Sequence, residues 1–282
     1  MIIFSSMAHD IQLSYSTPAD RATYWSSGLM PFQLMHAVLQ SPGYAHRYQS
    51  SKTGEQGWNR SVHYESGEQW ARERAEPTTL SLDAIPPPDR FLVFDFDIRS
   101  NTTHRPACVT SKRHDLHDVC LGCWESHVKP AMLVLDGMIE HAFGFPHEAA
   151  LRVFSGGNGL HVWYRLDKVD RAVQETLATS KPFRELLIKE YLAAPRLSRL
   201  EGLTPWPVWD ANATVDVFHS PPQHSAHPIK VPFSLHARTG MIALPLTRHG
   251  LPPLLSGHPP IEDYVVGRQL LDVWASGIDS GK

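Results

Sequence analysis

The chain has 282 residues, 42% hydrophobic and 20% charged, which is the composition of a globular protein. Its formal net charge of −3 excludes binding of nucleic acid through an overall positive charge, so such a partner must be held locally. No apolar run is as long as a membrane span, and the first ten residues lack the features of a signal peptide. We therefore expect a soluble, intracellular protein with no membrane partner.

The first ninety residues predict two short helices. Thr17 and Pro18 supply a hydroxyl cap and a proline in the first turn, so we expect a helix over 18–27. A second helix is expected over 31–39, where a Ser-Pro-Gly sequence follows. Residues 44–80 are polar and mixed, with a possible strand at 61–64 next to Arg60. A proline-rich connector follows at 84–88.

The sequence RFLVFDFD at 90–97 predicts a buried strand that ends in two acidic residues. Side chains alternate between the faces of a strand, so Asp95 and Asp97 point the same way. A divalent cation between the two carboxylates would remove their repulsion and the cost of burying them. The alternative is a strand whose acids run into a solvated turn.

An irregular stretch rich in Cys and His follows at 99–127. The sequence Cys-Leu-Gly-Cys at 120–123 is a two-thiolate knuckle of the kind that zinc uses. With the preceding residues it predicts a closed, structural zinc site of four ligands: Cys108, His114, Cys120 and Cys123. His117 and His104 are rival fourth ligands, and a redox pair or three unrelated thiols are the other interpretations. The three cysteines of the chain all lie in this stretch, so a secreted disulfide scaffold is not indicated.

Residues 124–143 have apolar side chains at a helical period with one buried face. Two strands are then expected, at 151–154 and 160–164, joined by the turn Ser-Gly-Gly-Asn-Gly at 155–159. Its glycines permit positive φ and leave backbone amides able to approach a phosphate. A plain turn, followed by a structural His161, is the alternative.

The C-terminal part predicts a helix over 168–193, broken near Pro182, and a helix over 261–275. Asp210 follows an apolar pair and precedes a turn, which suits a third metal-facing carboxylate or an Asx turn that caps a loop. A strand is expected at 241–246, after a basic segment. Three residues of that segment could contact a triphosphate or lie in a solvated loop: Lys230, His236 and Arg238.

Together and in this order, several segments resemble the small, catalytic subunit of archaeo-eukaryotic DNA primase, over residues 20–250. They are VFDFD, the Cys/His knuckle, FGF, SGGNGLHVW, WDANATVD and VPFSLHARTG. The resemblance implies an α/β (α+β) fold: one two-sheet catalytic domain over 1–282, with a zinc-binding insert at 104–124. It also implies DNA-directed synthesis of short RNA primers by nucleotidyl transfer.

The resemblance implies a role for each matching residue. It places two catalytic Mg²⁺ or Mn²⁺ ions on Asp95, Asp97 and Asp210, and one structural Zn²⁺ on Cys108, His114, Cys120 and Cys123. It assigns nucleotide binding to the glycine turn, to the basic segment and to an N-terminal arginine: Ser155, Gly156, Gly159, His161, Lys230, His236, Arg238 and Arg60. The family turn usually contains an arginine where this chain has Gly157 and Asn158, so Arg152 or Arg238 is the candidate substitute.

The implied partners are a single-stranded DNA template, nucleoside triphosphates, and a primase large subunit or a replicative helicase or polymerase. The implied location is the site of DNA replication, which is the nucleus in a eukaryotic cell. One alternative is a non-catalytic, zinc-stabilised nucleic-acid-binding subunit with the same fold. The other is a repair-type primase-polymerase that prefers deoxynucleotides.

Overall fold

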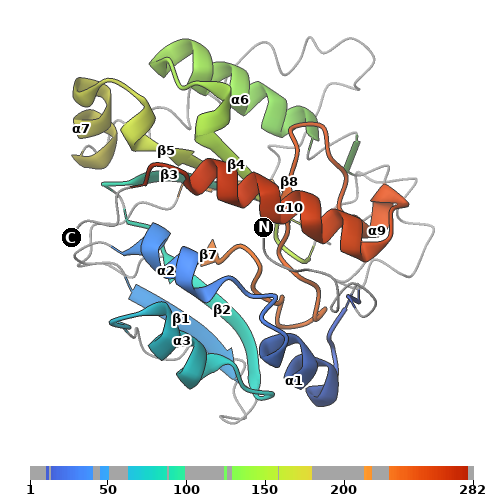
Figure 1. The fold of residues 1–282 in the computed structure, drawn as a ribbon. Helices are drawn as coiled ribbons and strands as arrows, with labels where there is room; N and C mark the ends of the chain where they lie inside the picture. The colour runs from blue at the N-terminus through green and yellow to red at the C-terminus, as the bar shows by residue number, and fades with distance from the viewer. Residues whose placement is uncertain are drawn as a thin grey trace. The chain divides into compact units, whose positions relative to one another are not determined.

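The computed structural model describes residues 11–12, 14–40, 45–50, 63–87, 89–98, 124–125, 129–157, 159–179, 213–217 and 229–278. The chain divides into two compact units that alternate along the sequence (Figure 1). The first unit comprises Met1–Pro87, Phe154–Gly157 and Pro228–Lys282, and the second comprises Pro88–Val153 and Asn158–His227. The single catalytic domain over 1–282 stays a prediction.

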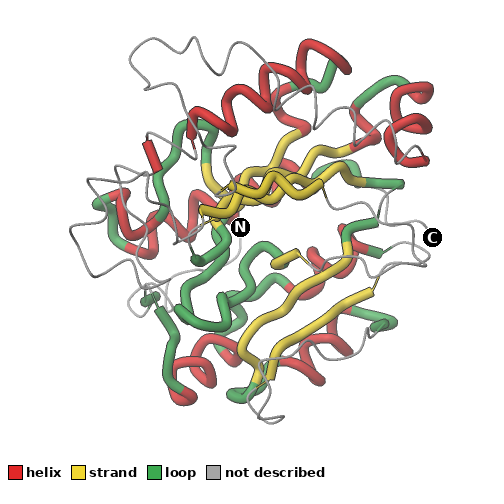
Figure 2. The backbone as a smooth tube through the Cα atoms, turned by 180° about the vertical axis from the view of Figure 1, so that it is seen from behind, coloured by secondary structure: helices red, strands yellow, loops and turns green. Residues whose placement is uncertain are grey.

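The first unit contains a three-stranded antiparallel sheet in the order β1-β2-β7. Its strands are β1 (Ala45–Ser50), β2 (Thr79–Ile85) and β7 (Ile229–Lys230). Figure 2 shows β1 and β2 running side by side. The sequence analysis predicted neither strand. β1 lies in the polar and mixed segment 44–80. Most of β2 lies beyond that segment, where Leu80, Leu82 and Ala84 alternate with polar residues, and its last two residues fall in the expected connector at 84–88. Of the strand expected at 61–64, the two described residues, His63 and Tyr64, are not in a strand.

The predicted N-terminal helices of the first unit are confirmed as α1 (Pro18–Ser26) and α2 (Phe32–Leu39). Thr17 caps α1, since its hydroxyl accepts a hydrogen bond from the backbone N–H of Asp20 (3.1 Å). The return hydrogen bonds from Thr17 lower the pKa of Asp20. Four further elements belong to this unit: α3 (Gly67–Arg74), β8 (Pro245–Leu246), α9 (Pro253–Ser256) and α10 (Pro260–Ala275).

Of the two elements predicted near the C-terminus, the helix is confirmed and the strand is confirmed only in part. The expected helix at 261–275 is α10. The strand expected at 241–246 forms only as β8. Met241 and Ile242 instead make isolated bridges, to Ser14 and Leu235 respectively. The segment changes neighbours along its length: Ala243 exchanges backbone hydrogen bonds with Phe233 and Ser234 (2.7 and 2.8 Å), whereas the carbonyl oxygen of Leu244 accepts from the N–H of Phe154 (2.9 Å).

The second unit contains strands in the order β6-β3-β5-β4. They are β6 (Ala213–Val217), β3 (Phe91–Ile98), β5 (Gly159–Arg165) and β4 (Ala150–Phe154). β3 is antiparallel to both β5 and β6. The strands predicted at 90–97, 151–154 and 160–164 are therefore confirmed. Together with the first unit, they confirm a mixed α/β protein with two sheets.

Helices accompany these strands in the second unit: α6 (Lys129–Phe143), the short η3 (His147–Ala149) and η4 (Leu166–Lys168), and α7 (Arg171–Thr179). α6 covers most of the helix expected at 124–143. α7 covers the first part of the helix expected at 168–193, of which 180–193 lies outside the described residues. The proposed zinc-binding insert also lies outside them, except for Trp124.

A buried polar cluster joins α6 to strands β4 and β5 of the second unit. Asp136 of α6 is fully buried, and one carboxylate oxygen accepts hydrogen bonds from Nε (3.0 Å) and Nη2 (2.5 Å) of Arg152. Its other oxygen accepts from the Tyr164 hydroxyl (2.5 Å). Burial, and then the neighbouring carboxylate, raise the pKa of Tyr164 well above its usual value. Arg152 is therefore committed to this cluster, and it is not the arginine that replaces the one missing from the glycine turn.

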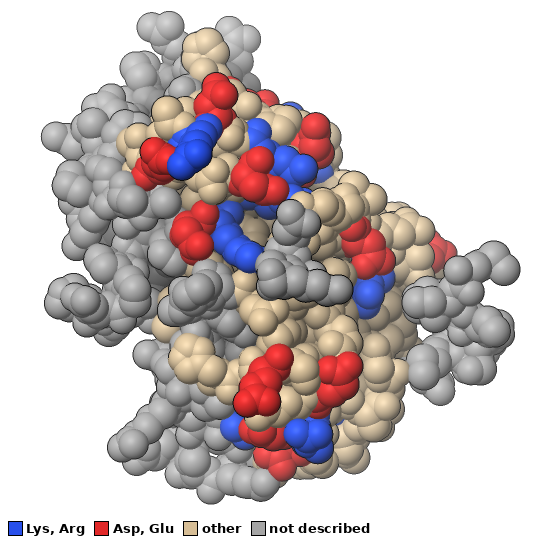
Figure 3. All heavy atoms as spheres, turned by 60° about the vertical axis from the view of Figure 1, so that its left-hand side comes forward, with Lys and Arg blue, Asp and Glu red and all other residues tan. Residues whose placement is uncertain are grey.

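In the described part of the chain no helix is both long enough and apolar enough to cross a membrane. On the face drawn in Figure 3, Lys and Arg side chains lie next to Asp and Glu side chains. Several surface pairs have the helical i,i+4 spacing: Lys129 with Glu125, Arg171 with Glu175, and Arg268 with Asp272. Such exposed pairs contribute little stability. They do balance the positive charge locally.

Candidate functional site

The predicted acidic strand and the predicted glycine hairpin are neighbours within the second unit. In the β3–β5 register, Asp95 lies opposite His161 and Asp97 lies opposite Gly159. On the other side of β3, Asp95 lies opposite Asp216 and Asp97 lies opposite Thr214. The backbone thus brings the DxD motif, from one part of the sequence, next to the histidine and the last glycine of the hairpin.

Asp216 is the second acid of the WDANATVD segment, and the sequence analysis gave it no role. Its position in β6 makes it the direct cross-strand partner of Asp95. The strand itself was not predicted, because the surrounding sequence reads as an Asx-type turn. Asp210, the predicted third carboxylate, lies outside the described residues.

Within the first unit, the glycine turn packs against the loop that carries His236. Gly156 has a positive φ of 79°, and a Cβ atom added there would lie 2.8 Å from Cβ of His236. A Cβ atom added at Gly157 would lie 2.9 Å from Nε2 of the same histidine. Gly156 requires glycine, because of its positive φ and because an added Cβ would also lie 2.8 Å from the backbone carbonyl oxygen of Met241. At Gly157 a side chain would displace only the ring of His236.

The loop between Lys230 and His236 is held in a strained conformation. Phe233 is a non-glycine residue with a positive φ of 67°, which is unfavourable for a side chain of this size. Its N–H donates to the carbonyl oxygen of Ala243 (2.7 Å), and its own carbonyl oxygen accepts from the Tyr24 hydroxyl. The adjacent Ser234 hydroxyl accepts from the N–H of Leu82 (2.7 Å). These bonds keep the loop in place despite the strain.

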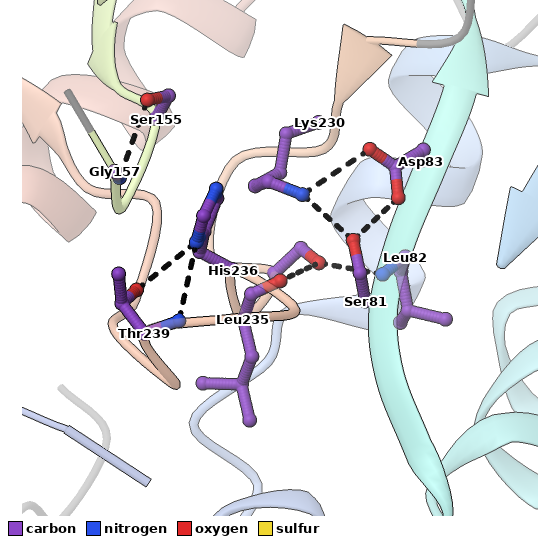
Figure 4. Close-up of polar contacts among 10 residues, drawn as sticks. Ser81, Leu82, Asp83, Ser155, Gly157, Lys230, Leu235, His236 and Thr239 are labelled. Carbon is purple, nitrogen blue, oxygen red and sulfur yellow. Dashed lines mark hydrogen bonds and ion pairs between the residues drawn. The ribbon is translucent and has the colours of Figure 1, made fainter. Parts of the chain in front are cut away.

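Lys230 is paired inside the first unit by two residues that the sequence did not single out (Figure 4). Its Nζ donates to the Ser81 hydroxyl (2.7 Å) and to a carboxylate oxygen of Asp83 (3.3 Å). The Ser81 hydroxyl in turn donates to the other oxygen of Asp83 (2.5 Å). Only 10% of the Lys230 side chain and 3% of the Asp83 side chain are exposed. An ammonium group has three hydrogens, so this pairing fixes its position and still permits a further acceptor.

The register of the first unit adds one more basic residue. Arg47 of β1 lies opposite Asp83 of β2, which lies opposite Lys230 of β7. Residues directly opposite one another in antiparallel strands share a face of the sheet. The row therefore alternates basic, acidic and basic across three strands. The sequence analysis did not anticipate this row, because it predicted neither β1 nor β2, although the alternation of Leu80, Leu82 and Ala84 with polar residues was a signal for β2.

The other predicted site residues lie as follows. Ser155 is buried, and its hydroxyl accepts a hydrogen bond from the N–H of Gly157 (3.3 Å). Arg238 is exposed and lies two residues after His236 in the same loop. His161 is buried in the second unit. Arg60 and the four predicted zinc ligands lie outside the described residues: Cys108, His114, Cys120 and Cys123. Within the described ranges, no group of three or more His, Cys, Asp or Glu side chains is arranged to hold a metal ion.

The fold is mixed α/β. It presents an acidic strand beside a glycine hairpin in one unit, and a glycine turn beside a basic loop in the other. Residues 94–200 match the family model of the DNA primase small subunit. The match confirms the resemblance predicted from the sequence and supports a nucleotidyltransferase of the primase class.

Among solved structures, the polymerase domain of Mycobacterium tuberculosis Ligase D in complex with DNA is similar to this chain. The likeness covers 96% of this chain and 95% of that one, with 16% sequence identity and a TM-score of 0.48.

Proposed function

We propose that this chain is a primase that joins ribonucleotides into short RNA primers on a single-stranded DNA template, inside the cell and as part of DNA replication. The observation that carries the proposal is the packing of the His236 loop on the glycine turn. It brings together two segments that the sequence separately indicated as phosphate-binding. The family match over residues 94–200 supports the same class of reaction.

The residues of the first unit would bind the triphosphate. The Ser155 hydroxyl, the amides of the glycine turn and the His236 ring supply hydrogen-bond donors for phosphate oxygens. Lys230 and the exposed Arg238 supply positive charge. Asp83 holds Lys230 in place before the substrate arrives.

A histidine and an N-terminal arginine complete the proposed set of phosphate contacts. His161 of the second unit would be another phosphate contact, from its place opposite Asp95. Arg60 was predicted to be the N-terminal arginine that reaches the triphosphate. Arg47 is the better supported candidate, because its register position opposite Asp83 puts it in the same cross-strand row as Lys230.

Asp95 and Asp97, with Asp210, would hold two Mg²⁺ or Mn²⁺ ions. Carboxylate oxygens are the ligands that these ions prefer. Asp95 and Asp97 lie two positions apart in β3, and Asp95 lies opposite Asp216 in β6, so the types of donor present suit such ions. When bound, such ions stabilise the charge on the attacking and leaving oxygens. Asp216 is the alternative to Asp210 as the third acid, because it lies opposite Asp95 in register.

A structural Zn²⁺ on Cys108, His114, Cys120 and Cys123 is the second metal proposal. Three thiolates and one imidazole form a closed, four-ligand set, which would leave no open position for catalysis. We expect metal analysis of the purified chain to find about one zinc per chain. Replacement of Cys120 by Ser should lower that content, whereas His117→Ala should not. Full zinc content in the Cys120 variant would rule out this ligand set.

Primer synthesis tests the proposed function directly. The purified chain is incubated with single-stranded DNA, Mn²⁺ or Mg²⁺, and either ribo- or deoxynucleoside triphosphates. We expect template-dependent products that require the metal and form faster from ribonucleotides. Faster incorporation of deoxynucleotides would instead indicate a repair-type primase-polymerase. Absence of synthesis, with nucleic-acid binding retained, would indicate a non-catalytic subunit.

Additional partners are part of the proposal. The mixed charges on the face drawn in Figure 3 offer no broad basic surface among the described residues there. Affinity for nucleic acid usually comes from neutralised phosphates. We therefore expect a large subunit, or a replicative helicase or polymerase, to contribute to template binding.

A further inference from the structure

The loop that follows β7 begins with a tight turn at 231–234. Its closing hydrogen bond runs from the N–H of Ser234 to the carbonyl oxygen of Val231 (2.9 Å). Pro232 is the second residue of the turn, and Phe233, with its φ of 67°, is the third. Proline followed by a residue of positive φ defines a type II turn, whose third position is normally glycine or asparagine. A phenylalanine therefore occupies a position where the backbone conformation disfavours it.

This turn links two segments that are each attached to other parts of the first unit. Before the turn, Lys230 is held on β2 by Asp83 (3.3 Å). After it, the hydroxyl of Thr239 donates to the carbonyl oxygen of Gly156 (2.5 Å), which fastens the segment with His236 to the glycine turn. A change in the conformation of the turn would therefore displace one of two groups that are proposed to contact the triphosphate.

Tyr24 of α1 holds the strained residue of the turn. Its hydroxyl donates to the carbonyl oxygen of Phe233, 209 residues away in the chain. Tyr24 is fully buried, and burial raises the pKa of its hydroxyl well above the usual value, so the group stays a donor. The N–H of Phe233 donates to Ala243 O (2.7 Å), and its ring packs edge-on against Tyr264, with the ring centroids 5.3 Å apart. Both backbone polar groups and the side chain of Phe233 are thus held in place.

Ser234 fixes the end of the turn to β2. Because Lys230 lies opposite Asp83, the next pair in the antiparallel ladder is Val231 with Leu82, and such a pair can exchange two backbone hydrogen bonds. The N–H of Val231 does donate to the Leu82 carbonyl oxygen (3.2 Å), but its own carbonyl oxygen closes the turn. The N–H of Leu82 instead donates to the Ser234 hydroxyl (2.7 Å). A side chain thus replaces the ladder acceptor, and Figure 4 shows that Leu82 lies next to the β2 residues that hold Lys230.

We propose that Tyr24 and Ser234 are positioning residues, which hold the type II turn so that Lys230 and His236 are in place for a nucleoside triphosphate. This inference rests on the proposed function for its consequence, which is tighter binding of the triphosphate. The anchoring of the turn itself does not depend on that function.

Tyr24→Phe removes the hydroxyl and keeps the ring. Tyr264→Phe is the matched control, because its hydroxyl is also buried in the first unit and also donates to a backbone carbonyl oxygen, that of Leu29 (2.7 Å), outside the turn. With ATP and Mn²⁺ as the probe, we expect Tyr24→Phe to bind about tenfold more weakly, because the contacts of Lys230 and His236 with the charged phosphates are misplaced. Ser234→Ala should weaken binding to a similar extent, and the control should stay within about twofold of wild type. Equal weakening by Tyr24→Phe and Tyr264→Phe, or wild-type binding by both Tyr24→Phe and Ser234→Ala, would overturn the inference.

Hydrogen exchange in the full chain, followed by NMR, provides a second measurement that works without nucleotide. The N–H groups of Phe233 and Ser234 are both hydrogen-bonded. Relative to the N–H groups of β2, we expect them to exchange about tenfold faster in Tyr24→Phe than in wild type, and at the wild-type rate in Tyr264→Phe. Unchanged exchange in a folded Tyr24→Phe protein would contradict the role of Tyr24. Faster exchange in that variant, together with a wild-type chain that binds no ATP, would support the anchoring of the turn and reject the proposed function.

Discussion

Asp97→Asn is expected to reduce primer synthesis by roughly a thousandfold, because a lost metal ligand removes several kcal/mol of transition-state stabilisation. Asp95→Asn should have a similar effect. Both residues lie in β3, next to the glycine hairpin of β5. The amide keeps the size of the side chain and removes its charge, so a loss of activity reports on the carboxylate.

The stability of the same variants provides a separate check. Asp95 lies opposite Asp216 across two antiparallel strands, and like charges in that position are destabilising. Asp95→Asn should therefore leave the melting temperature of the metal-free chain unchanged or higher. Asp272→Asn, in an exposed pair with Arg268 on α10, is the control and should keep full activity. Primer synthesis at the wild-type rate by Asp95→Asn or Asp97→Asn would reject the catalytic assignment.

Asp136→Asn should lower the free energy of unfolding by about 3–5 kcal/mol, because it leaves the Arg152 guanidinium charged and buried without its counter-ion. Side-chain exposure is 4% for Arg152 and zero for Asp136, so water cannot replace the lost interaction. The Tyr164 hydroxyl would also lose its charged acceptor. Urea unfolding followed by circular dichroism measures the difference.

The chain offers a matched control in the exposed pair Arg171–Glu175 of α7. Their side chains are 89% and 63% exposed, so Glu175→Gln should cost less than about 0.5 kcal/mol. Replacing the whole buried cluster by apolar residues (Asp136→Leu, Arg152→Met and Tyr164→Phe) should recover most of the loss. A small effect of Asp136→Asn alone would show that the buried pair contributes little to this fold.

The Asp136 cluster also bears on the missing turn arginine. The sequence left Arg152 and Arg238 as substitutes, because both lie near a predicted phosphate-binding segment. The structure commits Arg152 to Asp136, whereas Arg238 is exposed beside His236. Sequence distance could not separate them, because the partner of Arg152 lies in a helix 16 residues away whose polar residue had no predicted role.

Local patterns in the sequence were sufficient for β3 and for the hairpin of β4 and β5, whereas four strands that also carry site residues were not predicted: β1, β2, β6 and β7. The apolar run before Asp95 predicted β3, and the turn at 155–159 predicted the hairpin of β4 and β5. The Thr-Pro start of α1 predicted its cap. In each case the signal lies within a few neighbouring residues, because capping, turn chemistry and strand alternation are local properties of the chain.

The sequence by itself thus determined the mixed fold class and the residue types suited to phosphate and metal chemistry. Tertiary structure alone decided which residues the predicted ones contact: Lys230 contacts Asp83, and Gly156 contacts Thr239. It also placed Arg47 in register with Asp83. Asp83 and Lys230 are 147 residues apart, and Thr239 and Gly156 are 83 apart. Contacts over such separations depend on strand register and on close packing, which no short stretch of sequence encodes.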